Sequence, residues 1–402
     1  MFSLEQLGKI TSSKRIFKSE YVDTGIPFYR TKEIKELANG LKVSTELYIS
    51  KDRFNEINRK FGTPAIGDLL ITAIGTIGEI YVVDNTNFYF KDGNVLWLRD
   101  FRDIDPDFLK YSLMAFVDEL NTISHGSAYQ ALPIEKLKKH RLLKPPLAEQ
   151  KRIVAILDEA FEGIDRAIAI AEKNLANVRE LFESYLNSIF TQKGDGWVEK
   201  KLDEECEIIM GQSPDGSSYN SEGLGVPLIN GPVEFGGIEP FSKTVATKFT
   251  TEPTKMCKEG DLILCVRGST TGRMNIAGQE ACIGRGVSAI RSKNNQDWVN
   301  HFISFSRHKI YESGSGSTFP NVSSSELKKI IVPFPPKEQQ DYIVSQIKYL
   351  STETQRLEAI YRKKIAALKE LKQSILQKAF TGELTADTVE KAAWTLLKLI
   401  SN

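Results

Sequence analysis

Two long stretches of the chain place apolar residues at helical spacing. Within 145–191 the apolar positions step by three and four in strict alternation for about five heptads, which is the pattern of a coiled-coil seam. About 44 residues at a rise of ~1.5 Å give a rod of roughly 65 Å, longer than a small domain is wide. We therefore predict a long helix over 145–192 whose seam comprises Val154, Leu157, Phe161, Ile164, Ile168, Ala171, Leu175, Val178, Phe182, Tyr185 and Ile189.

A second long helix is predicted over 335–382, with a less regular seam. Ile343, Ile347, Leu350, Thr354, Leu357 and Tyr361 keep the alternation. Ile365 and Leu368 then shift its phase, as in a stutter that locally unwinds a supercoil. We expect the two helices to pack antiparallel within the chain, and a coiled coil between two chains is the alternative.

The rest of the sequence alternates on the shorter period of β-strands. Segments 1–144 and 193–334 carry short apolar runs, such as DLLITAI and DLILCVRG, between Gly, Asn and Asp turns. One helix is predicted at 106–121. The expected fold class is α+β, with two mixed domains joined by two long antiparallel helices that form a coiled coil.

The two halves of the chain are copies of one plan. A constant shift of 190 lays 145–191 on 335–381 with sixteen of 47 positions identical, among them Pro145/Pro335 and Gln150/Gln340. The globular parts echo each other only at turns and strands, as at GIPF (25–28) and GVPL (225–228). Such a repeat predicts pseudo-twofold symmetry, and duplex DNA is the commonest ligand with a matching dyad. The predicted segments are 1–144, 145–192, 193–334, 335–382 and a short amphipathic tail at 383–402.

Composition narrows the class of protein without naming a ligand. The chain has 53 basic and 52 acidic residues, a net charge of +1, which argues against strong non-specific binding of polyanions by the chain alone. Its four cysteines lie in the second half at spacings unsuited to zinc, and a reducing cytosol fits them. No apolar run approaches a membrane span, so a cytoplasmic protein is expected.

Catalytic motifs are absent from the sequence. It contains no phosphate-binding G-x-x-x-x-G-K-[ST] loop, no G-x-G-x-x-G after a strand and no [DN]-P-P-[FY] tetrapeptide of adenine methyltransferases. The four histidines form no pattern of nucleophile and base or of metal ligands. We therefore expect no catalytic or metal site, and interpret the chain as a recognition and scaffolding protein.

The doubled motif set resembles one known family, the specificity subunits of type I restriction–modification enzymes. PPLAEQKRIV (145–154) is very close to the family's P-P-x-x-E-Q-x-x-I, and PPKEQQDYIV (335–344) keeps it with Gln339 in place of the glutamate. The preceding G-[IV]-P and G-D-[LI]-[LI] elements also fit. The resemblance covers nearly the whole chain, and the ordered set occurring twice is specific.

This resemblance implies a function and partners. Each globular half would be a target recognition domain that reads one part of a bipartite, asymmetric double-stranded DNA sequence. The coiled coil would set the gap between the half-sites. The chain would not be an enzyme. It would recruit two adenine methyltransferase subunits and restriction (helicase-nuclease) subunits of a prokaryotic cytoplasm, and S-adenosylmethionine, ATP and Mg would belong to those partners.

Loops after the matched strands are the predicted DNA contacts. Arginine is favoured because its fork pairs bidentately with guanine, although scaffold roles in turns remain open for each residue. The candidates are Arg30, Lys32, Thr76, Ser127, Tyr129 and Gln130 in the first half, and Arg267, Ser269, Thr270, Arg273, Ser317, Phe319 and Asn321 in the second.

Two other classes of function are left open by the sequence alone. One is a coiled-coil adaptor whose globular halves bind proteins. The other is a fused restriction or methylation enzyme, which would need the catalytic motifs that the sequence lacks. Steep weakening of binding with salt would distinguish DNA binding from the adaptor.

Overall fold

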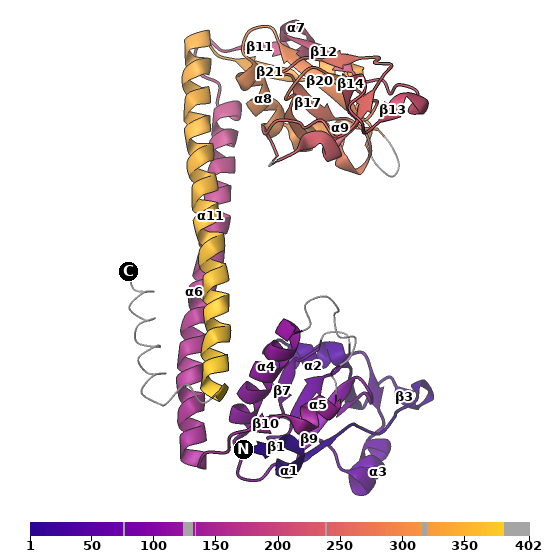
Figure 1. Cartoon of the computed structure of the whole chain (residues 1–402), viewed down its shortest axis with the longest axis vertical. Coiled ribbons are helices and arrows are strands. Elements are labelled where there is room, and N and C mark those ends of the chain that lie inside the picture. Colours follow the sequence, from indigo (N-terminus) through magenta and orange to yellow (C-terminus); the bar gives the residue numbers. More distant parts are fainter. Residues whose placement is uncertain (75–76, 124–131, 133, 238, 316–319, 382–402) are drawn as a thin grey trace. The chain divides into compact units, whose positions relative to one another are not determined.

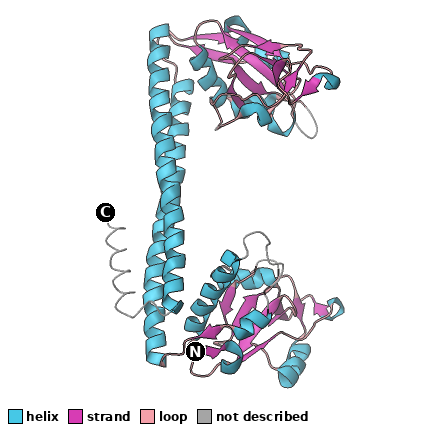
Figure 2. Cartoon of the chain, in the orientation of Figure 1, coloured by secondary structure: helices cyan, strands magenta, loops and turns pink. Residues whose placement is uncertain are grey.

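The chain forms two compact units, each with its own globular domain. Unit 1 comprises Met1–Lys173 and the chain from Tyr361 onward, and unit 2 comprises Asn174–Ile360. The structure, a computed structural model, describes all residues except 75–76, 124–131, 133, 238, 316–319 and 382–402 (Figure 1). Both globular domains mix strands with helices (Figure 2), as the alternating patterns predict.

The domain of unit 1 begins and ends at paired strands, β1 and β10. Its strands are β1 (Phe2–Ser3), β2 (Lys9–Thr11), β3 (Tyr21–Val22), β4 (Ile26–Tyr29), β5 (Tyr48–Ile49), β6 (Leu69–Thr72), β7 (Ile80–Val82), β8 (Tyr89–Phe90), β9 (Val95–Arg99) and β10 (Arg141–Leu142). Its helices are α1 (Leu4–Leu7), η1 (Lys18–Glu20), α2 (Thr31–Ala38), α3 (Lys51–Phe61), α4 (Pro106–Ile123) and α5 (Ile134–Lys139).

The domain of unit 2 begins and ends in the same way, at β11 and β21. Its strands are β11 (Val198–Lys201), β12 (Cys206–Met210), β13 (Tyr219–Asn220), β14 (Val226–Ile229), β15 (Phe249–Thr250), β16 (Met256–Cys257), β17 (Leu262–Cys265), β18 (Met274–Ile276), β19 (Ala281–Ile283), β20 (Val287–Ser292) and β21 (Ile331–Phe334). Its helices are α7 (Leu202–Glu205), η2 (Gly216–Ser218), η3 (Pro232–Phe235), η4 (Gly268–Thr270), α8 (Gln296–Phe305), α9 (Arg307–Ser313) and α10 (Ser324–Lys328).

The sequence repeat is also a repeat of strand order. The main sheet runs β2-β9-β6-β7 in unit 1 and β12-β20-β17-β18 in unit 2, antiparallel throughout. A second sheet runs β3-β5-β4-β8 in unit 1, and β13-β15-β14-β19 in unit 2 with β16 added at its edge. In both second sheets one pair is parallel, β4 with β8 and β14 with β19. The two domains therefore share one fold despite their divergent loops.

The matched G-D-[LI]-[LI] motifs are parts of this scaffold. Asp68 accepts a hydrogen bond from the Ala65 backbone N–H at 2.8 Å, and Asp261 accepts one from Lys258 at 2.8 Å. The glycine before each aspartate has a positive φ, +87° at Gly67 and +90° at Gly260, which favours glycine. The motif closes a tight turn before β6 and β17 and so starts each central strand at the same place.

The domains differ between their second sheet and the central strand. In unit 1 the eleven-residue helix α3 follows β5, capped by the Ser50 side chain, which accepts from the Arg53 backbone N–H. In unit 2 the short strand β16 occupies this part of the chain. The sequence repeat does not extend to this segment, and the secondary structure of the two units also differs there.

A long continuous helix follows each globular domain along the chain. These helices are α6 (Leu147–Thr191) and α11 (Lys337–Thr381), each of 45 residues and each beginning directly after a Pro-Pro pair. In unit 1, Leu157, Phe161 and Ile164 of α6 share a buried cluster with Leu368, Ile375 and Leu376 of α11. The two helices therefore pack on each other within one chain.

Ion pairs across the helices give their direction. In unit 1 Lys372 contacts Asp165 at 2.7 Å, and in unit 2 Arg179 contacts Glu358 at 2.8 Å. Within unit 2 alone, Phe190 lies beyond Arg179 along α6 and shares a buried cluster with Val344 and Ile347, which lie before Glu358 along α11. The helices therefore run antiparallel. The predicted seam residues are all buried or half-buried, namely Val154, Leu157, Phe161, Ile164, Ile168, Ala171, Leu175, Val178, Phe182, Tyr185, Ile189, Ile347, Leu350, Leu357, Tyr361 and Leu368.

The repeated glutamine of the P-P-x-x-[EQ]-Q motif ties each helix to the chain before it. Gln150 is fully buried, and its Nε2 donates to the carbonyl oxygens of Pro145 at 2.8 Å and Asp103 at 3.0 Å. Its Oε1 accepts from the backbone N–H of Asp105 at 2.8 Å. Gln340 repeats the bond to its own proline, Pro335, at 2.8 Å. The motif is a structural joint between globular domain and helix.

Among the described helices, none has both the length and the apolar character needed to cross a membrane.

Candidate nucleic-acid interface

Loops from distant parts of the sequence meet at one edge of the domain in unit 2. The backbone N–H of Gly284, after β19, donates to Ile229 at the end of β14 at 2.9 Å. Val266, after β17, donates to Gly286 at 2.9 Å, and Val322 donates to Val266 at 2.9 Å. We call this set the loop edge of unit 2; it comprises residues 211–213, 230–231, 266–273, 284–286, 315 and 320–322.

Two exposed arginines lie on this edge. Arg267 precedes η4 and bridges through its backbone to Asn321, and Arg285 follows β19 with its backbone N–H on the Ser213 hydroxyl at 3.1 Å. Neither guanidinium has an ion pair among the residues that the structure describes. Each is thus free to donate to an external acceptor, such as a base edge in the major groove.

Arg273, also a predicted contact, is already bound by an acidic side chain. Its Nε lies 3.0 and 3.1 Å from the two carboxylate oxygens of Glu239, and its Nη2 also contacts that carboxylate. The hydrogen bond to Glu239 raises the pKa of Arg273 above its ordinary value. A contact from Arg273 to DNA stays a prediction that would require this pair to open. Ser269 is exposed and Thr270 half-buried on the same edge, while Ser317 and Phe319 lie outside the described residues.

The loop edge of unit 1 is assembled by the same pairings. Lys91, after β8, donates its backbone N–H to Tyr29 at the end of β4 at 2.8 Å. Ala73, after β6, donates to Asn94 at 2.8 Å and accepts from Leu132 at 2.7 Å. This edge comprises residues 30–32, 73–74, 91–94 and 132. The predicted contacts Thr76, Ser127, Tyr129 and Gln130 lie outside the described residues.

A buried glutamate holds the turn after β4 and after β14. Glu33 accepts from the Arg30 backbone N–H at 2.7 Å, and Glu234 accepts from the backbone N–H groups of Asn230 and Gly231, each at 3.1 Å. Burial raises the pKa of Glu33, but hydrogen bonds from the side chain and backbone of Arg30 outweigh it, so the pKa lies below its ordinary value. The same frame thus presents arginine in unit 1 and asparagine in unit 2.

The side chain of Arg30 is oriented by that same glutamate. Its Nη2 lies 2.8 Å from Glu33 Oε1, and the side chain is 43% exposed. Lys32 is 60% exposed and 3.7 Å from Glu36, a loose surface pair. Ile74 is exposed at the place where unit 2 carries Arg267. The two edges therefore offer different donors from equivalent positions.

Three of these edge residues were missed by the sequence prediction: Lys91, Asn230 and Arg285. Each follows a strand of one of the two parallel pairs, β4 with β8 or β14 with β19. The sequence alone does not show that these strands pair or which residues then lie at the edge. Only a prediction that β4 pairs with β8, and β14 with β19, would have placed them beside the predicted arginines.

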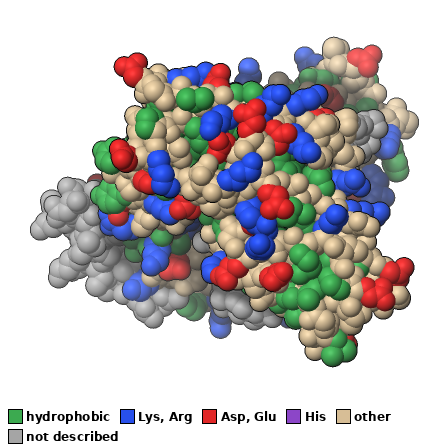
Figure 3. All heavy atoms as spheres, turned by 90° about the horizontal axis from the view of Figure 1, so that it is seen from above, with side chains coloured by type: hydrophobic (Ala, Val, Ile, Leu, Met, Phe, Trp, Pro, Cys, Tyr) green, Lys and Arg blue, Asp and Glu red, His purple; other side chains and the backbone are tan. Residues whose placement is uncertain are grey.

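Charge on the surface is mixed. On the face seen in Figure 3, Lys and Arg side chains alternate with Asp and Glu side chains. This agrees with the net charge of +1.

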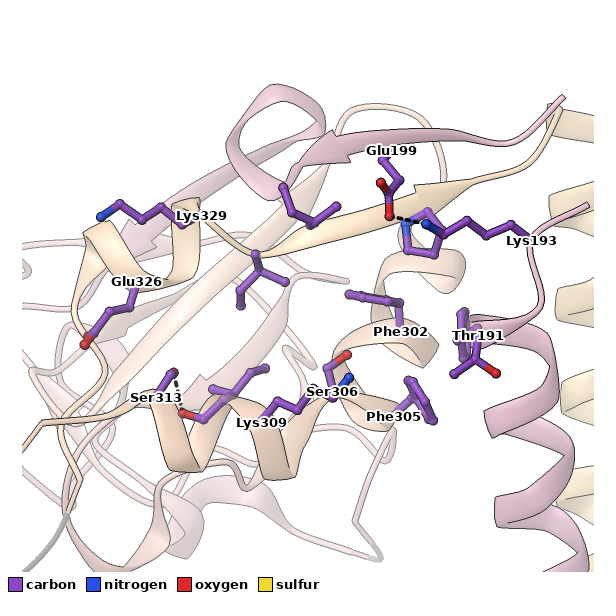
Figure 4. A pocket seen from close by; sticks show the side chains of 15 residues that line it. Thr191, Lys193, Glu199, Phe302, Phe305, Ser306, Lys309, Ser313, Glu326 and Lys329 are labelled. Carbon is purple, nitrogen blue, oxygen red and sulfur yellow. Dashed lines mark hydrogen bonds and ion pairs between the residues drawn. The ribbon is translucent and has the colours of Figure 1, made fainter.

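A groove in unit 2 lies between the end of α6 and the helices α8 and α9 (Figure 4). Its volume is about 380 Å³, and Phe302, Phe305 and Phe190 are among its apolar lining. Lys193 and Glu199 form an ion pair of 2.5 Å at its rim. Unit 1 has a groove of about 290 Å³. Its lining includes Ser112, Ala115 and Phe380, which correspond under the repeat shift of 190 to Phe302, Phe305 and Phe190 of the groove in unit 2. The two units thus carry grooves at equivalent places.

The cysteines offer no reactive site. Cys206, Cys257, Cys265 and Cys282 are all buried and unpaired. Burial raises the pKa of Cys206 and of Cys265 to about 12 and that of Cys257 to about 11, so these thiols stay protonated at neutral pH. Among the described residues no group of His, Cys, Asp and Glu is placed to hold a metal ion.

Known proteins resemble the chain along most of its length. Residues 1–177 and 194–368 both match the family described as "Type I restriction modification DNA specificity domain". The putative type I restriction enzyme MjaX specificity subunit of Methanocaldococcus jannaschii is 31% identical over 347 residues, 80% of each chain. The EcoKI specificity subunit of Escherichia coli is 23% identical over 304 residues, covering 69% of this chain and 65% of the relative.

Solved structures show the same fold. A chain from a study of complex assembly and conformational transition of the type I R-M system superposes with a TM-score of 0.80 at 25% identity, covering 95% of this chain and 97% of that one. The HsdS subunit from Thermoanaerobacter tengcongensis gives 0.60 at 24% identity, covering 95% and 96%. The two domains, the long helices and these matches together place the chain, as a non-catalytic, DNA-specificity subunit, in the type I restriction–modification specificity family.

Proposed function

We propose that each unit reads one part of a bipartite, asymmetric DNA sequence through its loop edge. The observation that carries this proposal is that two domains of one fold present different side chains on the same frame. After β4 the frame carries Arg30, and after β14 it carries Asn230. Arginine suits guanine and asparagine suits adenine in the major groove. Equal frames with unequal donors are what an asymmetric target requires.

The residues proposed for this readout divide by how freely they can move. Arg267 and Arg285 are exposed without an ion pair among the described residues, and are the first candidates. Arg30 and Arg273 are paired with Glu33 and Glu239, so a contact from Arg273 to DNA would require its pair to open. The remaining proposed contacts are Lys32, Lys91, Asn230, Ser269, Thr270 and Asn321, with Thr76, Ser127, Tyr129, Gln130, Ser317 and Phe319 outside the described residues.

We further propose that the chain scaffolds two adenine methyltransferase subunits and, with them, restriction subunits in a prokaryotic cytoplasm. The grooves at equivalent places in the two units support two copies of one partner, because each copy would meet a groove at the same place on the same fold. S-adenosylmethionine, ATP and Mg would be bound by those partners. The chain itself would supply recognition and spacing.

Mapping methylated adenines tests the proposal. The chain is co-expressed with an adenine methyltransferase subunit of a type I system, and modified adenines are located by single-molecule sequencing of genomic DNA. We expect one bipartite motif with different halves. In a matched pair of variants, Arg267→Ala should relax one base position, since a bidentate pair contributes about 1–3 kcal/mol of discrimination. Lys243→Ala removes an exposed cation of unit 2 that pairs with Glu259 outside the loop edge, and it should leave the motif unchanged. Methylation without sequence preference would refute the proposal.

A further inference from the structure

A cavity in the domain of unit 1 has a basic and aromatic lining. It has a volume of about 340 Å³, and Lys14, Lys60 and Arg99 line it together with Phe61 and Trp97. The residues that line it include no aspartate and no glutamate. A cavity with several cations and no carboxylate has a positive potential and suits an anion.

Two of these cations are held by aromatic rings instead of acidic side chains. The Lys14 ammonium lies 4.6 Å from the centre of the Phe61 ring, and the Arg99 guanidinium lies 4.2 Å from that of Trp97. Arg99 also donates from Nη1 to the carbonyl oxygen of Phe61 at 3.1 Å. A cation on an aromatic face is oriented but keeps its charge, so it can still bind an anion. Lys60 differs, because Glu56 pairs with it at 2.8 Å.

Helix α3, which unit 2 lacks, builds one wall of the cavity. Gly62 ends this helix with φ +79°, and a Cβ at this position would lie 3.1 Å from Arg99 Nη1. Glycine therefore both permits the backbone turn and leaves room for the guanidinium. The wall places Phe61 against Lys14 and Arg99 together.

Unit 2 provides an internal comparison for Arg99. In the strand register Lys9 faces Arg99 in unit 1, and Glu207 faces Arg291 in unit 2. Arg291 is bound by Asp261 at 2.7 and 2.8 Å and by Glu207 at 2.7 Å. The corresponding Asp68 accepts instead from Trp97 Nε1 at 2.8 Å, and Lys9 pairs with Asp100. One arginine position is thus neutralised in unit 2 and left without a carboxylate partner, among the described residues, in unit 1.

The cavity adjoins the loop edge of unit 1. The hydroxyl of Ser12, which lines it, accepts from the Gly93 backbone N–H at 3.1 Å and donates to the Val95 carbonyl oxygen at 3.3 Å. Residues 91–94 belong to the loop edge. DNA whose bases meet that edge brings its sugar–phosphate backbone to the flank, where a cation pair can bind it.

We propose that this cavity binds one backbone phosphate of DNA beside the bases read by unit 1, with Arg99 and Lys14 as its ligands. Unit 2 has no equivalent contact through Arg291. The inference rests on the proposed function, because it needs DNA at the loop edge. In this inference Arg99 and Lys14 position the DNA without reading its sequence, whereas the arginines of the loop edges read bases.

Salt dependence of DNA binding tests this inference. The full chain and its Lys14→Gln and Arg99→Gln variants are titrated against a fluorescein-labelled 30-base-pair duplex containing the mapped motif, at several KCl concentrations. Each variant should reduce the slope of log K against log [KCl] by about 1, and lower affinity about eightfold at 0.1 M salt if the curves meet near 1 M. The methylated motif should be unchanged. Arg166→Gln, which removes a cation paired with Glu162 on α6, is the matched control and should leave the slope unaltered.

Two further measurements separate the possible failures. Phosphate-ethylation interference should show one phosphate that matters to the wild-type chain and not to Lys14→Gln. Titration with inorganic phosphate asks whether the cavity serves a free phosphate instead; tight binding there with unchanged DNA slopes would overturn the inference. Unchanged slopes in folded variants, judged by their melting temperatures, would also overturn it. Absence of salt-dependent binding by the wild-type chain would instead count against the proposed function.

Discussion

At the scale of single residues, the repeated glutamines Gln150 and Gln340 make different numbers of hydrogen bonds and so should contribute differently to stability. Gln150 satisfies three backbone groups, those of Pro145, Asp103 and Asp105, whereas Gln340 satisfies the Pro335 carbonyl, and its Oε1 is buried without a partner among the described residues. Gln150→Leu should therefore destabilise unit 1 by about 3 kcal/mol, and Gln340→Leu should cost unit 2 about 1 kcal/mol. Hydrogen exchange followed by mass spectrometry reads each unit separately. Equal losses in the two units would contradict this account.

Burial of His301 predicts a pH dependence of stability. Burial lowers its pKa to about 4, with Asp297 opposing the shift and Lys348 adding to it. Between pH 6.5 and 4 the unfolded chain therefore binds a proton that the folded chain does not, so this residue's contribution is lost as pH falls through that range. At pH 5 the loss is about 2 kcal/mol relative to pH 7. Urea denaturation at both pH values should show a drop smaller by that amount in His301→Gln.

The exposed His308 provides the control for this measurement. His308→Gln removes a histidine from the same domain without removing a buried one, so the drop in stability between pH 7 and pH 5 should match that of the wild type. If both variants behave alike, the titration of His301 does not explain the pH dependence.

Residue chemistry was easier to predict from the sequence than residue surroundings. The arginine at 267 could be proposed because it follows a recognisable strand and a glycine turn. The pairing of Arg273 with Glu239 could not be predicted, because the two residues are 34 positions apart and a loop between strands brings them together. Lys91, Asn230 and Arg285 were missed for the same reason, because non-local pairing of parallel strands brings them to the edge.

At the scale of elements, the seam of α6 decides which leucines matter. Leu157 is fully buried in the cluster that α6 forms with α11 in unit 1, while Leu181 is 73% exposed in unit 2. Leu157→Ala should cost about 2–5 kcal/mol through lost contacts and a cavity, and Leu181→Ala should stay within about 0.5 kcal/mol. Thermal denaturation of the full chain measures both. A comparable loss from Leu181→Ala would indicate that this face is covered.

The long helices were predictable because their pattern is strong and local. An apolar stripe of eleven positions over about ten turns and a Pro-Pro start are read directly from the sequence. Helices α6 and α11 begin directly after their proline pairs. Helix α3 and strand β16 were not predicted. They lie where the repeat breaks down, so neither copy helps to interpret the other, and short elements depend on packing more than on their own pattern.

At the scale of the whole molecule, function depends on what is repeated and what is not. Strand order, turn-closing aspartates and the glutamates beneath the loop edges recur in both units. The hydrogen-bond donors on those edges differ between the units, and so does the ion pairing of Arg99 and Arg291. A duplicated frame with independent surfaces allows each half of a DNA site to change without altering the other, which is the property a specificity subunit needs.

The helices that join the units give the last prediction. Seven residues repeated after Lys173 in α6 and seven before Tyr361 in α11 would lengthen both partners equally, by about 10.5 Å at ~1.5 Å per residue. Because the insertion keeps the heptad phase, the antiparallel seam should survive. The spacer between the half-sites should then grow by about three base pairs, at ~3.4 Å each, with both halves unchanged. Methylation mapping of the double insertion measures this. An insertion in α6 alone leaves the seam residues mismatched and should lower the melting temperature instead, whereas an unchanged spacer in the double insertion would show that the helices do not set it.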